Sequence, residues 1–98
     1  MVEINWTHEA QVWLRDIHTY IAIDNPDAAQ RTVAGIFARA QLLRSNPRLG
    51  YRYHGETSRE VRILLYGHYR IAYLIQSEND IDILGVFHGS LSIERYLV

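Results

Sequence analysis

The 98-residue chain contains no cysteine and no lysine, and it has no long apolar run. Without cysteine it cannot form a disulfide framework, a thiolate nucleophile or a cysteine-based zinc site, which favours a reducing compartment. No segment approaches the roughly 18 consecutive apolar residues of a membrane span, and the N-terminus lacks the basic and apolar regions of a signal peptide. We therefore expect a cytoplasmic protein that does not enter a membrane.

The absence of lysine means that all ten basic residues are arginine, although the formal net charge is only −1. Arginine is suited to bidentate contacts with phosphate or carboxylate groups, so a local anion site is compatible with a protein that is not basic overall. GC-rich coding explains the same bias without a functional cause. Both explanations stay open.

Metal and phosphate motifs are also missing. The five histidines include no pair at i, i+4 spacing and none paired with an acidic residue at ligand spacing. The six glycines are scattered, so they form no phosphate-binding loop. We therefore expect neither a metal site nor a cofactor.

The first half of the chain predicts a strand and two helices. Residues 2–6 alternate apolar and polar side chains, which is typical of a strand. Thr7 is a candidate N-cap for a helix that runs to about Asp24, and Asn25-Pro26-Asp27 is a strong signal for the start of a second helix. The second helix should end at Asn46-Pro47. Two helices joined this closely form an antiparallel hairpin.

The second half predicts three strands. Apolar segments begin at Val61, at Tyr69 and at Ile81, and Gly67-His68 forms a two-residue turn between the first two. Residues 48–59 are expected to form a polar connection. The fold class is therefore α+β, with an N-terminal strand, a helical hairpin and a three-stranded antiparallel meander. A chain this short buries one core, so residues 1–98 should form a single domain.

Alternation along these strands gives the sheet two apolar faces. A two-residue turn places Leu65 opposite Arg70, and the same face should receive Ile83 and Phe87, while Leu84 joins the other face. One helical hairpin covers one face, so the second needs a partner or must be covered by residues 90–98. Both alternatives remain open here.

One edge of the meander gathers groups that can carry chemistry. Because strands alternate in direction, the turn before Tyr69 and the end of the third strand at His88 lie together, with Arg70 nearby and Tyr96 as a candidate neighbour. An imidazole, phenols and a guanidinium can cleave RNA without a metal, as general acid, general base and phosphate ligand. A turn role for His68 and a packing role for Tyr69 are the structural alternatives.

Element order and motifs together resemble a known group of proteins. The motifs are Asp24-Asn25-Pro26-Asp27-Ala28-Ala29, Asn46-Pro47-Arg48-Leu49-Gly50, Tyr69-Arg70-Ile71-Ala72-Tyr73 and Val86-Phe87-His88-Gly89. Over essentially the whole chain they resemble the ParE/RelE superfamily of toxins from type II toxin-antitoxin modules. The resemblance implies a cognate antitoxin protein as partner, in a hetero-oligomer. It also implies a target, which is DNA gyrase for ParE-like members and mRNA on the ribosome for RelE-like members.

Departures from the RelE-like pattern favour a ParE-like inhibitor of gyrase, a binding protein and not an enzyme. The lysines expected before the sheet are absent, and Gly89-Ser90-Leu91-Ser92 stands where basic residues are expected after the third strand. A RelE-like ribonuclease is the first alternative, with Arg70, His88 and Tyr96 as its catalytic residues. A non-toxic module that only binds the antitoxin is the second, because Ser90 stands where an arginine usually follows His88-Gly89.

The resemblance and the apolar faces together give two sets of candidate binding residues. We expect the target to be contacted by Arg59, Tyr69, Arg70 and His88. We expect the antitoxin to cover apolar residues of the helices and of the second sheet face, namely Trp13, Ile17, Ile36, Ile63, Leu65 and Phe87.

Overall fold

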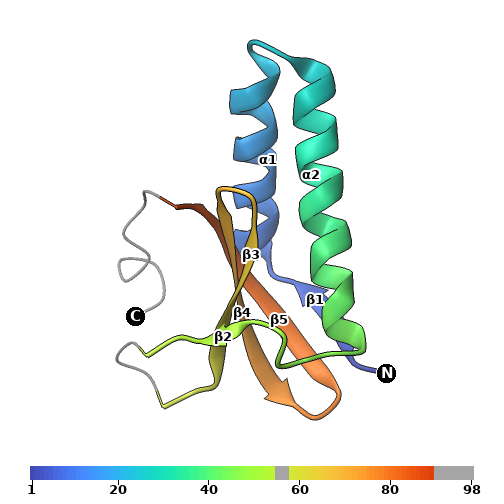
Figure 1. Cartoon of the computed structure of the whole chain (residues 1–98), viewed down its shortest axis with the longest axis vertical. Helices are drawn as coiled ribbons and strands as arrows, with labels where there is room; N and C mark the ends of the chain where they lie inside the picture. The colour runs from blue at the N-terminus through green and yellow to red at the C-terminus, as the bar shows by residue number, and fades with distance from the viewer. Residues whose placement is uncertain (55–57, 90–98) are drawn as a thin grey trace.

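The computed structural model describes residues 1–54 and 58–89 as a helical hairpin packed on a five-stranded sheet (Figure 1). The helical hairpin extends beyond the end of the sheet (Figure 1). In chain order the elements are β1 (Glu3–Trp6), α1 (His8–Ala22), α2 (Pro26–Gln41), the 3-10 helix η1 (Leu42–Arg44), β2 (Tyr51–Arg52), β3 (Val61–Tyr66), β4 (Tyr69–Ser77) and β5 (Asp80–His88).

Both predicted helix starts are confirmed by side-chain caps. The Thr7 hydroxyl accepts a hydrogen bond from the Ala10 N–H at 3.1 Å. The Asn25 side-chain oxygen accepts one from the Ala28 N–H at 3.0 Å, with Pro26 in the first helical position. Each cap satisfies a backbone donor that the first turn leaves without a partner, which fixes where the helix begins.

The sheet is larger than predicted. Its strand order is β1-β5-β4-β3-β2, so the predicted antiparallel meander of β3, β4 and β5 forms its centre. The predicted register is confirmed, with Leu65 opposite Arg70. However, β1 pairs in parallel with β5, and the expected connection contributes the short strand β2 antiparallel to β3. The three-stranded antiparallel sheet is therefore corrected to a mixed sheet of five strands.

A β-bulge changes which residues of β5 face the helices. Ala72 pairs with Gly85, whereas the next residue, Tyr73, pairs with Ile83, so Leu84 is the extra residue of the bulge. An extra residue reverses the alternation of side chains beyond it. Ile83 consequently joins the helix-facing core, and Leu84 packs on the opposite side. The predicted faces of these two residues are wrong for this reason.

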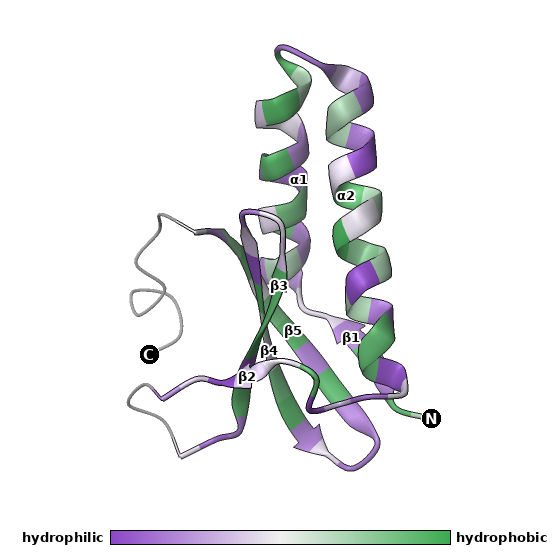
Figure 2. Cartoon of the chain, viewed as in Figure 1, coloured by the Kyte–Doolittle hydropathy of each residue, from purple (hydrophilic) through white to green (hydrophobic). Residues whose placement is uncertain are grey.

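The core has a large part between the helices and the sheet and a smaller part on the second sheet face. The larger part is built from buried residues of both helices and the central strands, including Ile36, Leu43, Ile71, Tyr73 and Val86. The smaller part consists of Ile63, Ala72 and Phe87, with Trp13, Tyr53 and Leu84 packed against it. The central strands are accordingly apolar, whereas the helices carry polar residues along much of their length (Figure 2).

The segment after η1 is held on the sheet by a buried tyrosine and an ion-pair cluster. The Tyr73 hydroxyl donates to the Pro47 carbonyl at 2.8 Å and accepts from the Gly50 N–H at 2.9 Å. Burial raises the pKa of Tyr73 above its ordinary value. The Glu60 carboxylate accepts from both Arg48 and Arg62, and Arg62 also donates to the Gly50 carbonyl at 2.7 Å.

Candidate functional site

The predicted gathering of side chains at one edge of the sheet is confirmed. Gly67, with φ of +56°, forms the turn between β3 and β4, and the Gly89 N–H donates to the His68 carbonyl at 2.7 Å. This bond ties the turn to the end of β5. The His68 and His88 rings stack with centroids 6.2 Å apart, and the Tyr69 ring meets His88 edge-on at 5.7 Å.

Arg70 belongs to the same corner. It lies between Leu65 and Phe87 in the sheet register, half-buried, and its Nη2 donates to the Gly89 carbonyl at 3.4 Å. We call the adjoining surface hollow, of about 420 Å³, the turn hollow. Its lining residues are Leu65, Gly67, His68, Tyr69, Arg70, His88 and Gly89.

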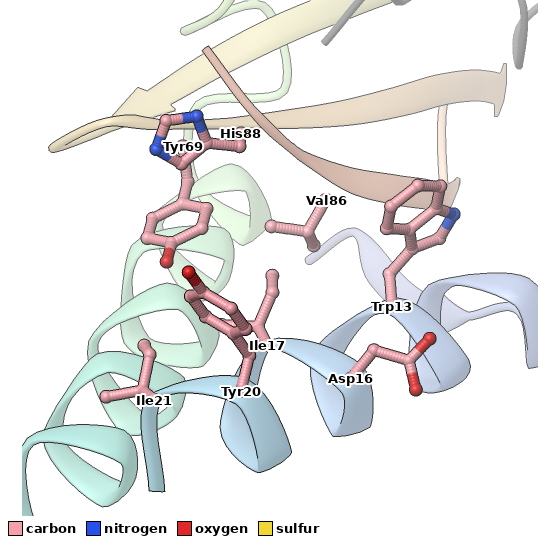
Figure 3. A pocket seen from close by; sticks show the side chains of 8 residues that line it. All are labelled: Trp13, Asp16, Ile17, Tyr20, Ile21, Tyr69, Val86 and His88. Carbon is pink, nitrogen blue, oxygen red and sulfur yellow. The ribbon is translucent and has the colours of Figure 1, made fainter. Parts of the chain in front are cut away.

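A second concavity, which we call the α1 groove, lies between α1 and the ends of β4 and β5 (Figure 3). It measures about 460 Å³ and is lined by Trp13, Asp16, Ile17, Tyr20, Ile21, Tyr69, Val86 and His88. Figure 3 shows Tyr20 and Tyr69 directed toward each other across the groove. Burial of the Tyr69 phenol raises its pKa above the ordinary value, and the nearby Tyr20 makes a smaller contribution in the same direction.

The structure separates Arg59 from the other candidate target contacts. Arg59 is exposed just before β3 begins at Val61, whereas Arg70 and His88 lie beside the opposite end of that strand. Six residues of strand span on the order of 20 Å. Tyr96, the candidate third catalytic residue, lies outside the described residues.

Three of the six candidate antitoxin contacts are buried within the chain. Ile36 has no exposed surface, and Ile63 and Phe87 are each 1% exposed. They offer no side-chain surface to a partner, because packing within the chain already covers them. The second sheet face is therefore closed at Ile63 and Phe87, and the alternative that residues 90–98 cover it lies outside the described residues. Leu65, which is 53% exposed, remains accessible on that face.

The other two candidates, Trp13 and Ile17, line the α1 groove and are half-buried. Tyr20 and Ile21 also line the groove, although neither is among the candidate antitoxin contacts, because their spacing of three and four residues from Ile17 is typical of an apolar helix stripe that packs on a core. Tyr20 is in fact 78% exposed. The helical hairpin extends beyond the end of the sheet (Figure 1), and the sheet covers the end of this stripe only in part.

Two kinds of feature are absent from residues 1–54 and 58–89. No three His, Cys, Asp or Glu side chains there converge as a metal site requires. No helix in these ranges is long and apolar enough to cross a membrane. The functional groups at the described site are imidazole, phenol and guanidinium groups, and they lie beside an apolar groove.

Comparison with known proteins assigns the family. Residues 4–92 match the model of a family described as "ParE toxin of type II toxin-antitoxin system, parDE". The chain belongs to this ParE toxin family. The matched range includes every described residue of the α1 groove and the turn hollow. The predicted resemblance to ParE/RelE toxins is thereby confirmed and narrowed to ParE.

Two known proteins are similar to this chain over most of its length. A Sinorhizobium fredii protein named "Putative toxin Y4kP" is 38% identical over 86 residues, which cover 88% of this chain and 86% of that protein. A solved structure titled "Chromosomal ParDE TA system from P. aeruginosa" superposes with a TM-score of 0.74 at 22% identity. That match covers 90% of this ParE chain and 96% of the other. At this identity the superposition shows a shared fold.

Proposed function

We propose that this ParE-family toxin acts in the cytoplasm by inhibiting DNA gyrase and that a cognate antitoxin protein neutralises it. The observation that carries the proposal is the family match over residues 4–92. Inhibition by binding, without RNA cleavage, is the activity that the superfamily associates with ParE-like members. The toxin and its antitoxin would form a hetero-oligomer.

The geometry also favours binding over cleavage. A RelE-like ribonuclease would bring basic residues before the sheet together with the arginine of the middle strand. Here Arg59 lies at the opposite end of β3 from Arg70, and Arg48 is engaged with Glu60 at 3.0 Å. The described basic residues of these two regions therefore do not converge on one phosphate.

The α1 groove is the surface that best fits the antitoxin. Its walls are mainly apolar, and Tyr20 at its rim is largely exposed, so an isolated chain leaves apolar surface in water. An amphipathic segment of the antitoxin would cover Trp13, Ile17 and Ile21 with apolar side chains. Full burial of one such side chain contributes about 1.5–3 kcal/mol. Asp16 at the rim favours a basic residue on the partner.

Induction of the toxin in growing cells separates the three candidate functions. If gyrase is the target, replication should stop and the DNA-damage response should rise, while transcripts stay intact. Ribosome-dependent cleavage of transcripts would instead indicate the RelE-like activity. Unimpaired growth with retained antitoxin binding would identify a non-toxic binding module. Either of the last two results would overturn the proposed target.

A further inference from the structure

The outer side of α2 carries an apolar stripe that the core does not use. We call the stripe the α2 face, and its residues are Ala34, Phe37, Ala38 and Leu42, the last of which lies in η1. All four are exposed, with Phe37 at 48% and Leu42 at 49%. Ile36 and Ala40, which are buried, belong to the core side of the helix. The α2 face is therefore a second apolar stripe on a helix whose first stripe is already packed.

The largest side chain of the α2 face is held in place by a neighbouring ring. Trp6 of β1 stacks on Phe37, with the ring centroids 5.8 Å apart and an interplanar angle of 18°. The contact covers part of the Phe37 ring and leaves the rest in water. A partner would meet a side chain that is already positioned, which lowers the entropy lost on binding.

Polar residues are arranged symmetrically about the centre of the α2 face. Asp27 and Arg44 have the same midpoint along the chain as Gln30 and Gln41, and Asp27 and Arg44 are both exposed. In two α2 helices packed antiparallel about this midpoint, Asp27 of each copy would lie level with Arg44 of the other, and Gln30 with Gln41. No ion pair within residues 1–54 and 58–89 engages Asp27 or Arg44.

We propose that the α2 face pairs with the α2 face of a second copy of this chain, with the two helices antiparallel. A two-fold axis requires a self-complementary surface, and the order of charges along α2 meets that requirement. A parallel pair would instead place Asp27 beside Asp27 and Arg44 beside Arg44. The short side chains of Ala34 and Ala38 allow the helix axes to approach to about 8–10 Å.

Pairing through α2 leaves the α1 groove open. The residues that line the groove come from α1, β4 and β5, and none comes from α2. The inference is therefore independent of the proposed antitoxin and gyrase contacts. With 16 residues, α2 is about 24 Å long. One pair of such helices buries less than the roughly 1,200–2,000 Å² of a stable interface, so we expect the dimer to dissociate in the micromolar range.

Sedimentation velocity of the full chain alone, at concentrations on both sides of this range, tests the pairing. A reversible equilibrium between monomer and dimer is expected. Asp27→Arg and Arg44→Asp should each weaken the dimer about tenfold or more, because each places like charges opposite at both ends of the interface. The double variant should restore the affinity. Glu78→Arg and Arg15→Asp make the same changes at exposed positions outside α2 and should have no effect.

Ala38→Glu gives a second test in case a charge reversal does not fold, because the position is exposed and both residues favour a helix. It should abolish the dimer, whereas Ile17→Asp in the α1 groove should not. Circular dichroism shows which variants are folded.

Four results would overturn the proposal. The chain could stay monomeric at every concentration, or the dimer could be lost in Ile17→Asp and kept in Ala38→Glu. The folded double variant could dimerise no better than the single variants, or the two control variants could weaken the dimer as much as the α2 variants. A monomeric chain in which Ala38→Glu weakens antitoxin binding would assign the α2 face to the antitoxin instead.

Discussion

At the residue scale, a single glycine allows β3 to approach α2. A Cβ atom at Gly35 would overlap both the hydroxyl and the ring of Tyr66, which is half-buried beside the helix under the Arg39 guanidinium. Glycine normally weakens a helix interior by about 0.5–1 kcal/mol relative to alanine. Its presence here is explained by this packing and not by helix propensity.

We expect Gly35→Ala to destabilise the protein by about 1–3 kcal/mol, because overpacking outweighs the gain in helix propensity. In a Tyr66→Leu background, which removes the obstructing ring, the same change should become neutral or stabilising. Urea unfolding of the four proteins in this double-mutant cycle measures the difference. An equal effect of Gly35→Ala in both backgrounds would contradict the packing explanation.

The carboxylate of Glu60 gives a prediction about pH. Its hydrogen bond with Arg62, together with Arg48, holds its pKa below the ordinary value of 4.5. A pKa that is lower in the folded state contributes stability at pH values above the unfolded pKa, and that contribution is lost as the pH falls through the folded pKa.

Glu60→Gln should therefore be less stable than the wild type at neutral pH, and the difference should shrink as the pH falls through and below 4.5. Chemical unfolding at a series of pH values measures this. Glu78→Gln, in the exposed turn between β4 and β5, is the control and should show little effect at any pH. A deficit of Glu60→Gln that persists unchanged in acid would exclude the ion-pair explanation.

At the scale of elements, local signals in the sequence were sufficient to predict the helices and the central hairpin. Thr7 and Asn25 cap the helices as predicted, and the Gly67-His68 turn sets the register of β3 and β4. The pairing of β1 with β5 depends on residues nearly 80 positions apart, as Glu3 and Asp80 show, and no local pattern encodes it.

The part of the candidate site that depends on strand direction could be predicted from the sequence. The turn and the end of β5 had to meet, so His68 and His88 could be placed together. The bulge at Leu84 could not be predicted from alternation, because it interrupts the alternation itself. Tyr53 and Trp13 pack against the cluster that contains Ile63 and Phe87. Because these two covering residues come from distant parts of the chain, the alternation along the strands could not show that Ile63 and Phe87 are buried.

The α1 groove gives a prediction at the same scale. Ile17→Asp places a charge inside the groove, so antitoxin binding should weaken by about tenfold or more, because the charge would be desolvated. His18→Asp makes the same kind of change at the next position of α1, which is exposed and does not line the groove. Isothermal titration with the antitoxin compares the two variants after circular dichroism has shown that both are folded. Equal affinities would show that the antitoxin binds elsewhere.

At the scale of the whole molecule, the chain combines a five-stranded sheet with a helical hairpin that extends past it. This arrangement leaves the end of the apolar stripe of α1 over a groove and places nitrogen donors in the neighbouring turn hollow. The two concavities share Tyr69 and His88. A partner seated in the α1 groove would therefore contact residues that also line the turn hollow, and under the proposed function the antitoxin and the target would compete for Tyr69 and His88.

The most direct test of the central claim is the supercoiling of relaxed plasmid by purified DNA gyrase in the presence of the chain. We predict that the toxin inhibits supercoiling and that an equimolar amount of its antitoxin restores it, because the antitoxin contact proposed for the α1 groove includes Tyr69 and His88, two of the candidate target contacts. Ribosomes translating a defined transcript under the same conditions should leave that transcript intact. Full gyrase activity at toxin concentrations that stop growth, together with cleavage of the transcript, would contradict the account.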